Sequence, residues 1–185
     1  MTTLRNPIRV ENIVATAEVT RALDLEQLAF DLPRTDYHRD RFPGLVYRTT
    51  NTEASILLFR TGAIVITGTR SKAGTRGALT DLVTKLRSLG VEVPDDPTLT
   101  IQNMVSSVQF SERLNLNAVA IGLGLENIEY EPEQFPGLIY RFDEMDVVTL
   151  LFGSGKAVIT GAVRRDEASE ALAHVRSRLE DLGVV

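Results

Sequence analysis

The stretch RFPGLVYR, from Arg41 to Arg48, decides the fold because it returns 93 residues later as QFPGLIYR, from Gln134 to Arg141. The same shift places LLFRTGAIVITG (57–68) on LLFGSGKAVITG (150–161). The matching segments keep their order, their spacing and their glycines. Self-similarity of this kind indicates an internal duplication and not a chance likeness of two α/β segments.

The duplication extends over almost the whole chain. Towards the N-terminus the shift is 91 residues, and it places VENIVAT (10–16) on IQNMVSS (101–107). The sequence PDDPT joins the two copies. We therefore predict a first repeat at 8–93, a linker at 94–98 and a second repeat at 99–184, with the two halves forming one domain.

The composition is that of a globular protein, with 43% hydrophobic and 24% charged residues among 185. No apolar run reaches membrane-spanning length and the N-terminus lacks a signal-peptide pattern, so we expect a soluble, cytoplasmic protein with no membrane contact. Without cysteine, and with only His38 and His174, we expect no metal site and no cofactor. A net charge of -5 and a pI near 5.1 argue against a protein held on nucleic acid by a basic surface.

Each repeat shows the same order of periodicities. Alternating stretches at 8–19 and 99–110 predict strands, and short amphipathic helices are expected at 23–32 and 114–123. Each repeat then closes with a long helix that has an apolar stripe. The first helix is expected to end at Gly90, with Leu89 as the last residue of its stripe, and the second is expected to end at Gly183. Turns are expected at Gly44, Asn51, Gly62 and Gly68, and at Gly137, Gly155 and Gly161. The predicted fold class is α+β, a meander of antiparallel strands with helices on one face.

Alternation along the strands separates two faces of the predicted sheet. One face is bulky and apolar, as at Ile64 and Ile66, and would be covered by the helices. The other is uncharged and carries small valines and threonines with one asparagine per repeat. Four phenylalanines stand at its strand ends and on Pro-Gly loops, as matched pairs. Core packing is the ordinary role of phenylalanine, but this placement favours wedges that enter base steps from the DNA minor groove.

The quoted segments, together with YEPEQFPGLIYR (130–141), resemble the TATA-box-binding protein family over residues 8–184, and most closely its archaeal, in particular haloarchaeal, members. The resemblance implies a curved ten-stranded antiparallel sheet of two pseudo-symmetric repeats, a saddle with helices on its convex face. It implies a nucleoid-associated general transcription initiation factor. Such a protein binds the TATA element of double-stranded DNA in the minor groove, kinks it by phenylalanine intercalation, and recruits transcription factor B and, indirectly, RNA polymerase.

The resemblance also assigns residues. Intercalation falls to Phe42 with Phe59 and Phe135 with Phe152, and hydrogen bonds to bases fall to Asn12, Asn103, Thr67 and Thr160, with Thr16 and Ser107 beside them. The groove floor would be lined by Val14, Val65, Val105, Val158, Leu57 and Leu150. Phosphates would be contacted by Arg48 and Arg141. Transcription factor B would bind the acidic loop of Glu131, Glu133 and Gln134, whose counterpart in the first repeat carries His38 to Asp40.

The sequence offers two alternatives to a DNA-binding factor, an enzyme and a protein-interaction module. The segment GSGK (153–156) resembles part of a phosphate-binding loop, but the glycine and Ser/Thr spacing of that motif is missing, so a hairpin turn is expected and not an enzyme. The alternative to DNA binding is a protein-interaction module that uses the same saddle. A homodimer of the free protein through the apolar face is a further expectation.

The charge pattern predicts salt adaptation. Lysine occurs only at Lys72, Lys85 and Lys156, among 20 basic residues, in an acidic chain. We expect cations to bridge carboxylates and phosphates in the complex. The family's usual basic residue after the turn glycine is kept as Lys156 and replaced by Ala63 in the first repeat.

Overall fold

The computed structural model describes residues 7–124 and 126–184. The chain divides into two compact units, which we call the N-unit (12–102) and the C-unit (103–185 together with 1–11). The division between them falls inside the first strand of each repeat. The boundaries 8–93, 94–98 and 99–184 stay a prediction from the sequence.

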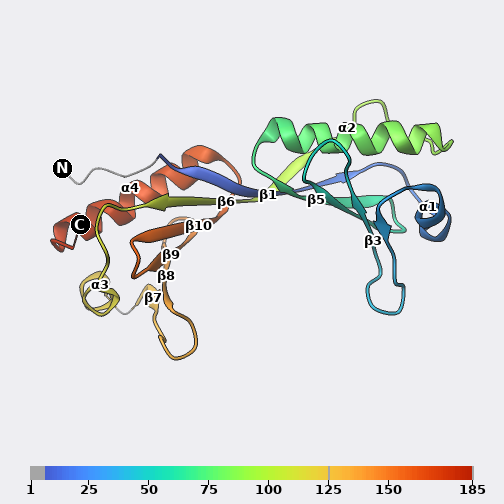
Figure 1. The fold of residues 1–185 in the computed structure, drawn as a ribbon. Helices are drawn as coiled ribbons and strands as arrows, with labels where there is room; N and C mark the ends of the chain where they lie inside the picture. Colours follow the sequence, from blue (N-terminus) through green and yellow to red (C-terminus); the bar gives the residue numbers. More distant parts are fainter. Residues whose placement is uncertain (1–6, 125, 185) are drawn as a thin grey trace. The chain divides into compact units, whose positions relative to one another are not determined.

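The N-unit contains most of the first repeat (Figure 1). Its elements are β1 (Arg9–Glu18), α1 (Leu25–Asp31), β2 (Thr35–Asp36), β3 (Leu45–Arg48), β4 (Ser55–Leu58), β5 (Ala63–Thr69) and α2 (Lys72–Ser88). The strands pair antiparallel in the order β2-β3-β4-β5-β1.

The C-unit repeats this plan. Its elements are β6 (Thr100–Gln109), α3 (Leu116–Leu123), β7 (Ile128–Glu129), β8 (Gly137–Arg141), β9 (Val148–Phe152), β10 (Lys156–Ala162) and α4 (Arg165–Asp181). Its strands pair antiparallel in the order β6-β10-β9-β8-β7. The described residues thus form ten strands and four helices, which confirms the predicted α+β class and the duplication. No helix in the described part of the chain is long and apolar enough to cross a membrane.

Capping side chains set the starts of three helices. Asp24, Ser71 and Asn115 each precede a helix and accept a hydrogen bond from the backbone N–H three residues further on. Such caps satisfy N–H groups that have no partner inside the helix. The short helices therefore begin two residues later than their apolar pattern alone predicts.

Each unit buries the apolar face of its sheet under its two helices. Ile64 and Ile66 are at most 1% exposed, as predicted. The stripe of α2 is buried at Ala78, Leu79, Leu82, Val83 and Leu86. Leu89 was wrongly placed in that stripe, since it is the C-cap of the helix and is 40% exposed.

The glycines that were expected at turns have three separate roles. Gly62 and Gly155 do form tight turns, and in the GSGK segment the N–H of Gly155 donates to the carbonyl of Phe152 at 2.9 Å. Gly68 and Gly161 have φ of +90° and +95° and lie where the strand register shifts, so they form β-bulges and not turns. Gly44 and Gly137 lie beneath phenylalanine rings.

Candidate nucleic-acid interface

The face of the N-unit sheet opposite its helices is a row of uncharged side chains. The register aligns Val46 with Leu57, Leu57 with Val65, and Val65 with Thr16. All four are half-buried, as is Val14 two residues from Thr16 on the same strand. Because paired residues of antiparallel strands point to the same side, these side chains form one surface.

The C-unit presents the equivalent row. Ile139 pairs with Leu150, Leu150 with Val158, and Val158 with Ser107. Val105 is half-buried beside them. The structure therefore brings the predicted groove-floor residues of each repeat together on one face of each unit.

Val46 and Ile139 belong to this surface and were missed from the sequence. Each precedes by two residues an arginine, Arg48 or Arg141, that was assigned to DNA contact. Since side chains alternate along a strand, that spacing was the signal that could have found them.

Asn12 is held by the bulge of β5. Its Oδ1 accepts a hydrogen bond from the backbone N–H of Gly68 at 2.7 Å, and its Nδ2 donates to Oγ1 of Thr67 at 3.1 Å. A backbone N–H can only donate, so the network fixes which end of the amide carries the oxygen. Nδ2 keeps its second hydrogen for another acceptor.

Asn103 makes the same contacts with the bulge of β10. Oδ1 accepts from the N–H of Gly161 at 2.8 Å and Nδ2 donates to Oγ1 of Thr160 at 3.1 Å. Both units therefore present an oriented amide donor on the uncharged face. The minor-groove edges of A·T pairs offer only acceptors, so such a donor suits them.

The four phenylalanines form two edge-to-face pairs. The ring centroids of Phe42 and Phe59 are 5.9 Å apart at 64°, and those of Phe135 and Phe152 are 5.8 Å apart at 69°. Phe42 and Phe135 are 38% and 37% exposed. The pairs are therefore partly exposed wedges at the strand ends and lie outside the buried cores.

A glycine lies under each pair. A Cβ on Gly44 would be 2.7 Å from Cε1 of Phe42, and one on Gly137 would be 2.6 Å from Cε1 of Phe135. Real Cβ atoms do not approach so closely. The glycine of each FPG segment therefore leaves room for the ring.

The two arginines assigned to phosphates differ in their surroundings. Arg48 pairs with Ser55, which pairs with Thr67, so it shares the uncharged face at its exposed edge. Nε of Arg141 donates to a carboxylate oxygen of Glu129 at 2.9 Å. A phosphate contact by Arg141 has to replace this exposed ion pair, which is worth little in water.

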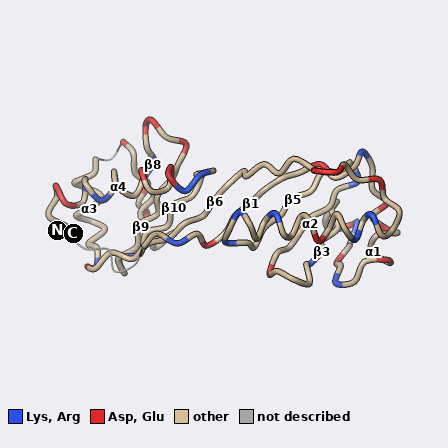
Figure 2. Tube along the Cα trace, turned by 90° about the horizontal axis from the view of Figure 1, so that it is seen from above, with Lys and Arg blue, Asp and Glu red and all other residues tan. Residues whose placement is uncertain are grey.

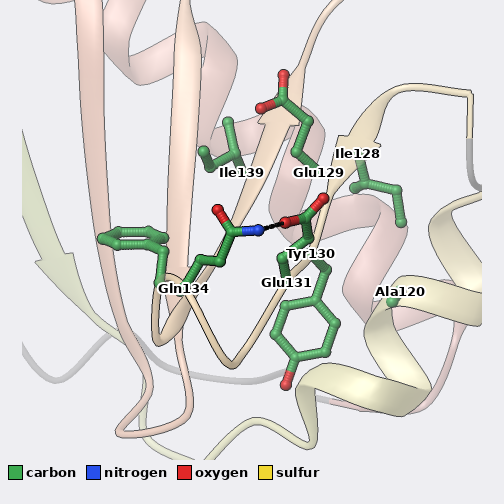
Figure 3. Close-up of a pocket in the computed structure, with 9 residues that line it drawn as sticks. Ala120, Ile128, Glu129, Tyr130, Glu131, Gln134 and Ile139 are labelled. Atoms are coloured by element: carbon green, nitrogen blue, oxygen red, sulfur yellow. Dashed lines mark hydrogen bonds between the residues drawn. The ribbon is translucent and has the colours of Figure 1, made fainter.

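The acidic loop of the second repeat is a tight turn. The N–H groups of Gln134 and Phe135 both donate to the carbonyl of Glu131 at 2.9 Å, and the Gln134 amide also binds the Glu131 carboxylate, as Figure 3 shows. Glu133 is exposed. In the first repeat, His38 accepts the same two backbone bonds, from Arg41 and Phe42.

This loop borders an open pocket of about 660 Å³ in the C-unit (Figure 3). Apolar side chains from α3, β7 and β8 line it, and Glu129 and Glu131 supply its carboxylates. Figure 2 shows that charges gather mainly in the loops and helices, while the strands are largely neutral. An apolar surface therefore lies directly beside the acidic loop.

A tandem α+β repeat with an uncharged strand face in each unit defines a class of two-repeat antiparallel β-sheet proteins. A family model described as "Transcription factor TFIID (or TATA-binding protein, TBP)" matches residues 7–89 and 98–182. The chain belongs to this family. Its members are transcription factors and not enzymes, as the sequence predicted.

Full-length relatives support this membership. The chain is 52% identical to a TATA-box-binding protein of Haloarcula marismortui, over 98% of this chain and 97% of that relative. It is 51% identical to TATA-box-binding protein B of Halobacterium salinarum over the whole of both chains. The solved structure of Methanococcus jannaschii TBP matches with a TM-score of 0.86 and 38% identity, over 95% of this chain and 99% of that one. The predicted resemblance to haloarchaeal members is confirmed.

Proposed function

We propose that the uncharged strand faces of this TATA-box-binding general transcription factor lie in the minor groove, and that its two phenylalanine pairs enter base steps and kink the duplex. The oriented amides of Asn12 and Asn103 carry this proposal, because they place a donor on each face. A face with amide and hydroxyl groups between valines and leucines fits the acceptor-only edges of A·T pairs. Partly exposed rings at the strand ends are suited to unstacking base steps.

The low net charge agrees with this mode of binding. Burial of apolar surface in the groove reduces the share of affinity that phosphate neutralisation must supply. Arg48 and Arg141 then contact phosphates at the edges of the faces. When no DNA is bound, the same apolar surface supports a homodimer of the protein.

The partner surface is the loop of Glu131, Glu133 and Gln134. Its carboxylates would bind basic side chains of transcription factor B, which in turn brings RNA polymerase to the promoter. The equivalent loop of the first repeat has His38 and Arg39 in place of Glu131 and Pro132. This difference supports binding of the partner at one repeat only.

A gel-shift experiment tests DNA binding. Wild type and the double variant Phe135→Ala, Phe152→Ala are titrated against a TATA duplex and a duplex with G·C pairs in the same places. Wild type should prefer the TATA duplex, and the variant should lose most of that affinity. Equal binding in all four combinations would refute the proposal.

A further inference from the structure

A hydroxyl group on the uncharged face of the N-unit accepts a hydrogen bond from a neighbouring amide. Nε2 of Gln102 donates to Oγ1 of Thr16 at 2.8 Å. Thr16 pairs with Val65, so its side chain lies on that face. Because the hydroxyl is the acceptor in this contact, its own hydrogen stays available to another acceptor.

The matching hydroxyl of the C-unit, that of Ser107, donates a hydrogen bond where Thr16 accepts one. Oγ of Ser107 and Oε1 of Glu11 are 2.5 Å apart. An ionised carboxylate has no proton to give, so Ser107 is the donor and its hydrogen is already engaged. Ser107 pairs with Val158, so this contact also lies at the uncharged face.

These two contacts occupy the same positions of the duplicated sequence. The shift of 91 residues places Glu11 on Gln102 and Thr16 on Ser107. This single difference, a carboxylate in place of an amide, therefore reverses the role of the matching hydroxyl in the C-unit. The Thr16 hydroxyl can donate, whereas the Ser107 hydroxyl and the Glu11 carboxylate offer only oxygen lone pairs.

The minor groove distinguishes these two arrangements. A·T pairs present only acceptors there, and a G·C pair adds the guanine N2 amino group as a donor. We infer that Glu11 makes the two units differ in base preference, and so gives DNA binding a direction: the free Thr16 hydrogen in the N-unit favours an A·T pair, and the Ser107–Glu11 pair in the C-unit accepts a G·C pair through guanine N2. This inference rests on the proposed function.

The direction of binding can be measured because the chain has no cysteine of its own. A Ser154→Cys variant carries one label site in the C-unit, in the exposed turn between β9 and β10. An iron–EDTA group on that cysteine cleaves DNA near this turn. The probes are derived from a symmetric duplex of A·T pairs. In each probe one A·T pair in one half of the duplex is replaced by a G·C pair, and the position of this pair differs from probe to probe.

The labelled protein with Glu11 and Gln102 unchanged should cleave at least one probe mainly in the half that carries the G·C pair. The expected bias is about ten-fold, which is the effect of one favourable or mismatched base pair. Glu11→Gln should remove the bias. The exchange variant Glu11→Gln, Gln102→Glu should reverse it. Glutamate and glutamine side chains have nearly the same size, so the fold is retained in both variants.

The inference is overturned if Glu11→Gln keeps the wild-type bias, or if it changes the affinity for all probes by one common factor, as a simple charge effect would. Failure of the proposed function looks different. In that case the wild-type protein would not distinguish the A·T duplex from one made only of G·C pairs.

Discussion

A methyl group on Gly137 would lie 2.6 Å from Cε1 of Phe135 and 3.0 Å from Cε1 of Phe152. Gly137 lies inside β8, in ordinary backbone conformation, so an alanine there is strained only by these rings. The glycine is therefore required by the phenylalanine pair and not by a turn.

Gly137→Ala should displace the Phe135 ring and weaken DNA binding about ten-fold, since overpacking of this kind costs roughly 1–3 kcal/mol. Fluorescence anisotropy measures the affinity, and energy transfer between labelled duplex ends measures the kink. The control is Gly77→Ala in α2, where an added Cβ meets nothing within 4 Å. If both variants bend DNA as wild type does, the glycine does not position the wedge.

Asn103→Asp separates the structural role of this side chain from its role as a donor. A carboxylate oxygen can still accept from the N–H of Gly161, so the bulge should persist, but the Nδ2 donor is lost. We expect a loss of roughly 1–3 kcal/mol in binding to an A·T site and little change in thermal unfolding. Asn117→Asp on α3 adds the same charge away from the face, and it should bind as wild type does. Wild-type affinity of Asn103→Asp would contradict the donor role.

The repeat, the strand faces and the buried sides of the helices could be predicted from the sequence because they depend on local periodicity. Alternation at Ile64, Val65 and Ile66 requires only that one face is buried. Matching segments in both copies then fixed which face each strand presents.

The missed features depend on contacts between distant segments. The bulge at Gly68 exists because Asn12 reaches it from 56 residues away. Gly44 is needed because the rings of Phe42, from the loop before β3, and Phe59, directly after β4, meet above it. Neither relation leaves a periodic signal, so both were interpreted as turns.

The core of the second repeat contains two buried hydroxyls that have no hydrogen-bond partner among the described residues, those of Ser106 and Thr149. Both pair with Ile159. The first repeat has Ala15 and Ile56 in these places. At these two positions the first repeat therefore buries only apolar side chains, whereas the second repeat buries hydroxyls that have no partner within the described residues.

Thr149→Val should raise the free energy of unfolding by about 1–2 kcal/mol, because it removes an unsatisfied hydroxyl with almost no change of shape. Urea unfolding followed by circular dichroism measures this. Thr75→Val is the matched control: the Thr75 hydroxyl donates to the carbonyl of Ser71 at 3.0 Å, so its loss should destabilise by about 1 kcal/mol. Destabilisation by both variants would show that Thr149 has a partner in solution.

Charge reversal in the acidic loop should separate partner binding from DNA binding. Glu131→Lys with Glu133→Lys should abolish the supershift that transcription factor B gives on a TATA complex, while DNA affinity stays the same or rises. His38→Glu with Asp40→Lys alters the equivalent loop of the first repeat and should leave the supershift intact. Loss of the supershift in both variants would contradict one-sided recruitment.

The two units should contribute differently to the salt dependence of DNA binding. Beside Phe59, Glu18 pairs with Ala63, whereas in the C-unit Gln109 pairs with Lys156. The N-unit thus has a carboxylate and no cation where the C-unit has a cation and no carboxylate. A bound cation between Glu18 and a phosphate would offset this difference, and it would make wild-type affinity nearly independent of salt or rising with it.

Ala63→Lys supplies that cation covalently. Each phosphate contact made by a lysine adds about -0.9 to the slope of log K against log salt, so Ala63→Lys should steepen the slope by about one. Lys156→Ala should make it shallower by the same amount. The measurement is TATA affinity over a series of KCl concentrations from about 0.2 to about 2 M, a range in which an ordinary basic protein loses most of its binding. A steep fall for wild type would sink the salt-adaptation hypothesis, and an unchanged slope for Ala63→Lys would show that this part of the N-unit does not meet a phosphate.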